Sequence, residues 1–128
     1  MHTGRNNLLF DMKYFNISEF DSPDVKGSGE GMNKDLLQII DKARDLFAKP
    51  IHINSGMRTV ERNALVGGSK NSSHLRGLAI DLACDNSRDR YRLIEIFMLL
   101  GINRIGIAKT FIHIDIDPEK DSDVIWTY

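Results

Sequence analysis

Hydrophobic residues recur along the chain with two different periods, and each period predicts one kind of element. From Asn33 to Phe47 they return every three or four positions, which predicts a helix with one buried face. A similar stretch from about Arg88 to Leu100 predicts a second long helix, with Tyr91 on its inward side. Val60 to Leu65 predicts a short helix, for which Thr59 is a suitable N-terminal cap.

The other period is the strict alternation typical of half-buried strands, clearest at the late segment with His113 and Asp115. These two side chains point to one face of that strand, and the intervening isoleucines point to the other. The predicted strands are Ile51–Asn54, Leu78–Cys84, Arg104–Ala108, Thr110–Ile116 and Val124–Tyr128. The order of elements predicts one α+β domain over residues 1–128, an antiparallel sheet with helices packed on one face. Residues 1–16 receive no assignment.

A metal site follows if two of these strands pair. The same alternation places Asp81 on the face opposite to Leu78, Ile80 and Leu82, so Asp81 and His113 can meet across the strand pair. His74 lies seven residues before Asp81, on the other side of a turn, and can fold over the same face. Two histidines and one carboxylate, with one position left open, form a ligand set of catalytic zinc.

Composition excludes several other classes of protein. The net charge of −1 and the pI of about 6.4 give no electrostatic basis for binding nucleic acid or an anionic membrane. The single Cys84 excludes an internal disulfide and is expected to be a buried core thiol. No apolar run has the length of a membrane span. The first residues lack a signal-peptide core, so we expect synthesis in the cytoplasm.

The chain resembles the zinc D-Ala-D-Ala carboxypeptidase family, which includes cell-wall carboxypeptidases, D-Ala-D-Ala dipeptidases and phage endolysins and shares its fold with hedgehog signalling domains. The resemblance rests on four motifs in a fixed order: Ser55-Gly56-Met57-Arg58-Thr59; Asn63 with Val66-Gly67-Gly68; Ser72-Ser73-His74-Leu75-Arg76-Gly77-Leu78-Ala79-Ile80-Asp81; and His113-Ile114-Asp115. It covers roughly Ser18 to Trp126, nearly the whole chain. In its small size and its lack of a wall-binding module, the chain is most similar to the compact, often phage-encoded members of the family.

The resemblance implies a role for each matching residue. The ligands of one zinc ion (Zn2+) per chain would be His74, Asp81 and His113. Arg58 would hold the substrate near the scissile bond, since a guanidinium matches a carboxylate. Ser72 would bind substrate or hydrogen-bond within its turn, and Gly77 would keep a side chain away from the metal.

The chain departs from the family pattern at one catalytic position. Many members carry an acid/base residue three positions before the last ligand, where this chain has Thr110. Asp115 is our candidate for the general base, with orientation of a ligand as its alternative role. His52 is a weaker candidate, with a structural role as its alternative.

The resulting hypothesis is a monomeric zinc metallopeptidase that hydrolyses stem peptides of peptidoglycan. It would act as a D-Ala-D-Ala carboxypeptidase or as an L-Ala-D-Glu endopeptidase of the endolysin kind, on cell walls reached by release or delivery. The resemblance does not choose between these bonds. Two rival hypotheses stay open: a zinc-stabilised binding module without catalysis, which Thr110 favours, and a metal-free α+β domain.

Overall fold

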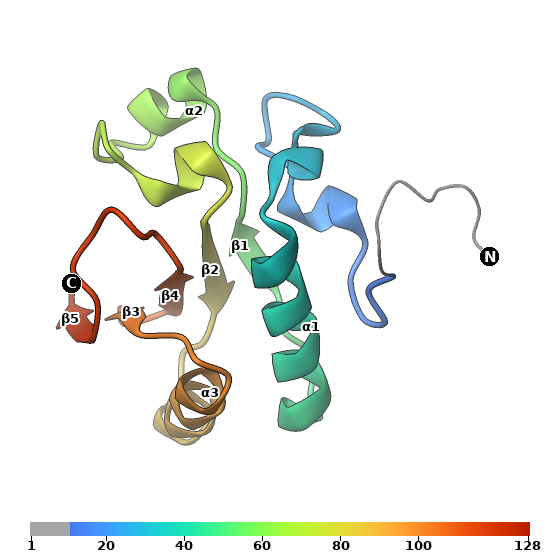
Figure 1. Ribbon diagram of the computed structural model, residues 1–128, viewed down its shortest axis with the longest axis vertical. Coiled ribbons are helices and arrows are strands. Elements are labelled where there is room, and N and C mark those ends of the chain that lie inside the picture. The colour runs from blue at the N-terminus through green and yellow to red at the C-terminus, as the bar shows by residue number, and fades with distance from the viewer. Residues whose placement is uncertain (1–10) are drawn as a thin grey trace.

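The computed structural model describes residues 11–128, so most of the unassigned segment 1–16 lies outside the described residues. The described chain has α+β architecture (Figure 1). Its helices are α1 (Lys34–Phe47), α2 (Val60–Leu65) and α3 (Ser87–Leu99). Short 3-10 turns are formed by Ile17–Phe20, Ser28–Gly31 and Ser73–Arg76. None of the described helices is both long and apolar enough to span a membrane.

Five strands form one sheet in the order β1-β2-β4-β3-β5. Their bounds are β1 (Ile53–Ser55), β2 (Ala79–Ala83), β3 (Arg104–Ile107), β4 (Phe111–Asp115) and β5 (Val124–Thr127). The pairs β1–β2, β2–β4 and β3–β4 are antiparallel, as expected, but β5 is parallel to β3. β4 already has β2 and β3 as its two neighbours. The chain after β4 therefore passes the start of β3, and β5 pairs with the edge of β3 that faces away from β4.

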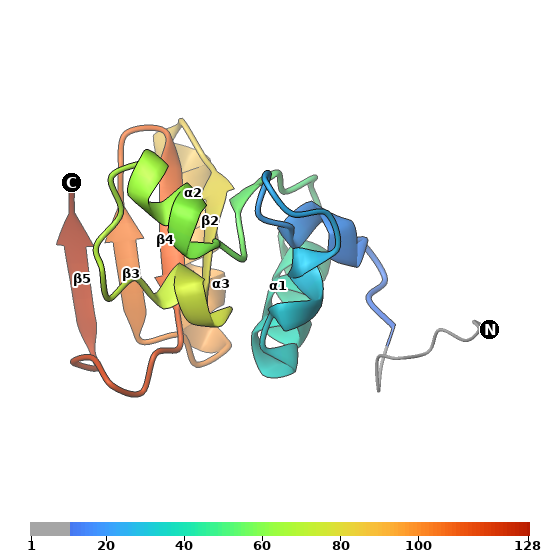
Figure 2. The same cartoon turned by 90° about the horizontal axis from the view of Figure 1, so that it is seen from above.

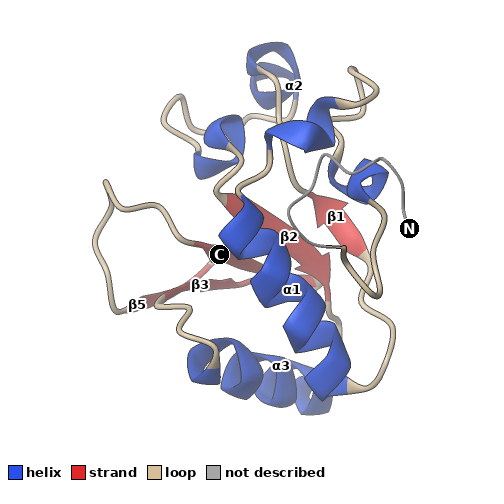
Figure 3. Ribbon diagram, turned by 45° about the vertical axis from the view of Figure 1, so that its right-hand side comes forward, coloured by secondary structure: helices blue, strands red, loops and turns tan. Residues whose placement is uncertain are grey.

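Helices α1 and α3 cover the apolar face of the sheet (Figure 3). The core includes Leu36, Ile40 and Phe97 from these helices and Ile80 and Ile112 from the central strands, all at most 1% exposed. Asn33 caps α1, because its side chain accepts a hydrogen bond from the Leu36 amide. The prediction for Tyr91 was wrong, since it is 73% exposed and α3 instead buries Leu93, Ile96 and Phe97.

On the other face of the sheet, the turn at Ser73–Arg76 packs against β2, and α2 lies farther out on the same side (Figure 1). Figure 2 shows the central strands between α3 on one side and α2 on the other. Thr59 caps α2 by accepting from the Arg62 amide, as predicted. Polar side chains on this second face of β2 and β4 therefore lie on the same side of the sheet as the turn.

Candidate metal centre

Three side chains converge on the polar face of the sheet. One ligand atom from each of His74, Asp81 and His113 lies within 4.8 Å of the other two. Asp81 and His113 are direct partners in the β2–β4 register, with 2.8 Å between Asp81 Oδ1 and His113 Nδ1. The turn brings in His74, whose Nε2 is 3.3 Å from Asp81 Oδ2. The strand pairing predicted from the sequence is therefore confirmed.

The donor set fits zinc, because each imidazole has one nitrogen held by the protein and one directed at Asp81. His74 Nδ1 is 2.8 Å from the Gly56 carbonyl oxygen, to which it can only donate, which leaves Nε2 as the ligand atom. His113 Nε2 is 2.7 Å from Asp115 Oδ2, which leaves Nδ1. Histidine ligands of metals ordinarily donate their second ring N–H to a carbonyl or a carboxylate in this way.

Electrostatics favour positive charge at this place. Burial would raise the pKa of Asp81, but hydrogen bonds from His113 and His74 outweigh it, and the pKa lies well below its usual range. Burial would lower the pKa of His113, but the carboxylates of Asp115 and Asp81 outweigh it, and the pKa is raised. Two carboxylates thus stabilise a cationic imidazolium here, and a divalent cation gains from the same negative surroundings.

Asp115 lies behind His113 and has its oxygens occupied. It is 1% exposed, and its Oδ1 accepts from Arg104 Nε at 2.6 Å and from the Asp117 amide at 3.2 Å. Burial would raise its pKa, but the bonds from His113 and Arg104 lower it more. These contacts favour the orienting role over the role of general base. The catalytic assignment of Asp115 stays a prediction.

Arg58 lies at the edge of the same group, with its Nη2 3.8 Å from Asp81 Oδ2. Its Nη1 donates to Asn63 Oδ1 at 3.1 Å and its Nη2 to Ser55 Oγ at 3.3 Å. Burial lowers the pKa of Arg58, yet a guanidinium keeps its charge at neutral pH. The guanidinium has more N–H donors than these contacts use, so it can still bind a ligand.

Asn63 belongs to the second sequence motif and accepts from Arg58 in the structure, although the sequence predicts no role for it. It is 5% exposed and donates through Nδ2 to the Ser69 carbonyl at 2.8 Å, so it links Arg58 to the loop after α2. A Cβ at Gly68 would lie only 2.0 Å from Asn63 Oδ1, which explains the glycine there. An asparagine inside a short helix, where its helix propensity is low, was the available signal.

We expect Asn63→Ala to lower peptide turnover about tenfold while zinc binding stays unchanged, because Arg58 loses the partner that orients it. The loss of a buried amide should also reduce the free energy of unfolding by about 1–3 kcal/mol. Steady-state kinetics, zinc analysis and thermal unfolding measure the three effects. The matched control is Asn71→Ala, an exposed asparagine of the same loop. Equal activity of the two variants would contradict the positioning role.

The other candidates take different places. Ser72 lines a cleft into which the metal group opens. Its Oγ accepts from the His74 amide at 3.2 Å and so caps the turn. The role of Ser72 in substrate binding stays a prediction. Gly77 has φ +70°, and a Cβ there would lie 2.3 Å from the Gly31 carbonyl oxygen. A glycine is therefore required at position 77 by the turn and by the close approach of Gly31. The expected reason, crowding of the metal by a side chain, is not the one that the structure shows. His52 is exposed and is not among the described residues that line the cleft.

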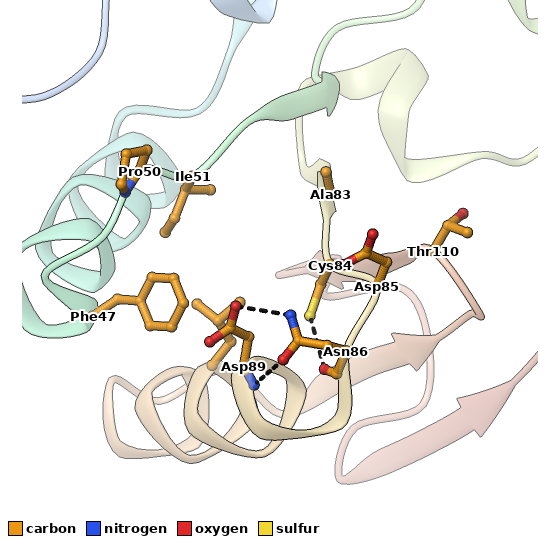
Figure 4. Close-up of a pocket in the computed structure, with 10 residues that line it drawn as sticks. Phe47, Pro50, Ile51, Ala83, Cys84, Asp85, Asn86, Asp89 and Thr110 are labelled. Atoms are coloured by element: carbon orange, nitrogen blue, oxygen red, sulfur yellow. Dashed lines mark hydrogen bonds between the residues drawn. The ribbon is translucent and has the colours of Figure 1, made fainter.

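Thr110 lies away from the metal group. Figure 4 shows it beside a separate cavity of about 230 Å³, which Cys84 and Phe47 also line. The Thr110 carbonyl accepts from the Cys84 amide, at the end of β2. Cys84 itself is 6% exposed, as predicted for a core thiol. The position three residues before the last histidine thus supplies nothing to the site in this chain.

Two further features were not predicted from the sequence. Asp117, 3% exposed, accepts from Ser73 Oγ at 2.7 Å and forms an ion pair with Arg76, which fastens the turn that carries His74. Trp126 and Tyr128 line the cleft from the C-terminal strand. Both features depend on the path of the chain after β4, for which the sequence pattern gives no signal.

The metal group opens into a cleft of about 460 Å³, which Arg58, Ser72 and Tyr128 also line. In comparison with protein families, the sequence model described as Peptidase M15 matches residues 13–116, which is most of the chain. The chain belongs to this family. A comparison with curated proteins finds no match.

Membership in peptidase M15 gives the group a chemical context. The family is one of zinc-dependent metallopeptidases that act on peptidoglycan-related substrates, and the predicted resemblance to the zinc D-Ala-D-Ala carboxypeptidases is confirmed. The match includes the described positions of His74, Asp81 and His113. An M15 peptidase needs a zinc site beside an open cleft, and this group is a metal-binding candidate at the base of one.

Proposed function

We propose that the protein is a zinc-dependent peptidase that hydrolyses an amide bond in the stem peptides of peptidoglycan. The observation that carries the proposal is the convergence of three ligand atoms within 4.8 Å at the base of an open cleft, in a member of peptidase M15. His74 Nε2, Asp81 and His113 Nδ1 would hold the metal. When bound, zinc acts as a Lewis acid that polarises a carbonyl and acidifies water.

The protein's own residues would divide the remaining work. Arg58, held by Asn63 and Ser55, would bind a carboxylate or carbonyl oxygen of the peptide next to the scissile bond. Asp115 would keep the His113 ring in place from behind, with Arg104 as its own partner. The contribution of Arg58 grows as negative charge develops on the substrate oxygen, so it favours the transition state over the substrate.

A second candidate function is a zinc-binding module without catalysis. Among the described residues, the carboxylates that line the cleft are Asp81 and Asp115, and each is engaged by neighbours in the protein. Thr110, at the usual place of the acid/base residue, lies outside the cleft. These observations favour the module, whereas the open cleft and Arg58 favour the peptidase.

The experiment is a digest of purified peptidoglycan with zinc-loaded protein, followed by mass spectrometry of the released fragments. We expect cleavage of the stem peptide. Release of a single terminal alanine would establish a D-Ala-D-Ala carboxypeptidase, and cuts between L-Ala and D-Glu would establish a lytic endopeptidase. Intact walls of several types, with one zinc per chain, would contradict the peptidase and support the module.

Two further parts of the proposal concern the setting of the activity. We propose that the protein acts as a monomer, which light scattering of the purified chain tests. We also propose that it reaches cell walls by release or delivery, as phage-encoded lytic enzymes do. Fractionation of producing cells before and after lysis would contradict this if the protein were already found at the wall.

A further inference from the structure

Three aromatic side chains form one wall of the cleft, and the proposed roles of the metal group and Arg58 leave this wall without a function. Phe111 comes from β4, and Trp126 and Tyr128 come from β5 and its end. The Tyr128 ring centroid is 5.1 Å from that of Phe111, and the Trp126 centroid is 5.5 Å from the imidazole of His113. The wall is therefore in contact with a ligand of the proposed zinc site.

The tyrosine is held in a defined position. Gly106 of β3 pairs with both His113 and Trp126, and a Cβ on it would lie 2.6 Å from the indole Nε1, so the glycine lets the indole lie across β3. A phenol carries its own O–H, which can donate to an acceptor in the cleft. The Tyr128 amide also donates to the Ile107 carbonyl at 3.3 Å.

Tyr128 lines the same cleft as the charged side chains of the site. Tyr128 interacts electrostatically with Asp81, Asp115 and Arg58. The residue as a whole is 70% exposed, but partial burial is still the main cause that raises the pKa of Tyr128. The carboxylates of Asp81 and Asp115 also raise this pKa, whereas the guanidinium of Arg58 lowers it. The net pKa is above the usual value, so the group is a neutral hydroxyl at pH 7. Such a group cannot act as a base, but it can donate a hydrogen bond.

Topology places this donor across the metal group from Arg58. Arg58 follows β1, which is one edge of the sheet, and Tyr128 follows β5, which is the other edge. The ligands Asp81 and His113 lie on β2 and β4 between them. Tyr128 is also 70% exposed, so a peptide that enters the cleft can contact it. A carbonyl at the metal group would therefore have a cationic donor on one side and a neutral donor on the other.

We propose that Tyr128 is a further catalytic residue, whose hydroxyl donates a hydrogen bond to the scissile carbonyl oxygen as that oxygen gains negative charge. The proton stays on the tyrosine, and no bond to the side chain forms or breaks. This inference rests on the proposed peptidase function and adds a residue to it. A donor aimed at developing charge contributes more in the transition state than in the substrate complex, so its effect belongs in kcat.

The test compares Tyr128→Phe with the wild type in two measurements on zinc-loaded protein. The first is the kinetics of stem-peptide cleavage, where we expect kcat to fall roughly tenfold to a hundredfold with little change in KM. The second is the affinity for phosphinate analogues of D-Ala-D-Ala and of L-Ala-D-Glu, whose tetrahedral oxygens mimic the charged state. We expect a parallel loss of affinity for the analogue that binds, with unchanged zinc content. The matched control is Tyr91→Phe, an exposed tyrosine on α3.

The outcomes separate this inference from the proposed function. An active wild type with an equally active Tyr128→Phe variant would overturn the role of the hydroxyl and leave the peptidase intact. If Tyr128→Ala raises KM and Tyr128→Phe is as active as the wild type, the ring of Tyr128 only contributes packing contacts to the bound substrate. That result also overturns the catalytic role of the hydroxyl. A wild type that binds an analogue without cleaving peptide still tests the donor through the affinity measurement. A wild type that neither cleaves nor binds refutes the proposed function, and this inference falls with it.

Discussion

Replacing His113 with alanine is expected to lower the affinity for zinc by a factor of roughly 100 or more and to abolish peptidase activity. Loss of a residue that merely orients a ligand commonly costs 10- to 100-fold in metal affinity or activity, so loss of a ligand itself should cost at least as much. His113 faces Asp81 through one nitrogen and is held by Asp115 through the other. Elemental analysis and calorimetric zinc titration measure the effect.

The control for this substitution is His52→Ala, which removes an exposed histidine outside the cleft. It should keep one zinc per chain and full activity. Circular dichroism of the His113→Ala variant tells loss of the metal from loss of the fold. A folded variant that binds zinc with wild-type affinity would show that His113 is not a ligand, and the proposed metal centre would be wrong.

Asp115 gives the second large effect, and two substitutions distinguish its possible roles. If Asp115 orients His113, Asp115→Ala should lose roughly 10- to 100-fold in zinc affinity or activity. Asp115→Asn should retain much more of both, because an amide oxygen can still accept from His113 Nε2. If Asp115 is the general base, both variants should lose turnover on the order of 100-fold while zinc binding persists. Zinc titration and kinetics of both variants decide between the roles.

The contacts in the structure lead us to expect the first pattern. Both substitutions leave Arg104 without its carboxylate partner at 2.6 Å, so thermal unfolding has to be recorded in parallel. Asp121→Asn, which changes an exposed carboxylate in the loop before β5, is the matched control. A folded Asp115→Asn variant that binds zinc normally but is as inactive as Asp115→Ala would restore the general-base interpretation.

The sequence predicted the elements and the convergence of the three candidate ligands for the same physical reason. Alternation on two strands defines which face each side chain takes, so pairing them in register was enough to place Asp81 opposite His113. The capping residue Thr59 is an equally local signal, and its cap forms as expected. Signals that depend on a few neighbouring residues were therefore reliable in this chain.

The features that the sequence did not predict depend on contacts between segments far apart in the chain. The occupied state of Asp115 arises from Arg104 on the neighbouring strand, a pairing that alternation within β4 cannot reveal. β5 is parallel to β3 because it pairs with the free edge of that strand. The aromatic wall forms because β5, in this place, brings Trp126 and Tyr128 to the cleft. The sequence of α3 is compatible with two buried faces, one with Tyr91 and one with Leu93 and Phe97. Packing against α1 buries the second face and leaves Tyr91 exposed.

β5 lies at the edge of the sheet and carries part of one wall of the cleft, apart from the elements that carry the three candidate metal ligands. The three candidate metal ligands belong to central strands and to a turn fastened by Asp117, so their geometry is fixed by neighbours on several sides. Trp126 and Tyr128 come from a strand with a single neighbour, β3. Trp126 contacts His113 and is therefore tied to the metal group, whereas changes at Tyr128 can reshape the cleft wall and leave the candidate ligands in place. Within the proposed function, this is a simple route from one cell-wall bond to another.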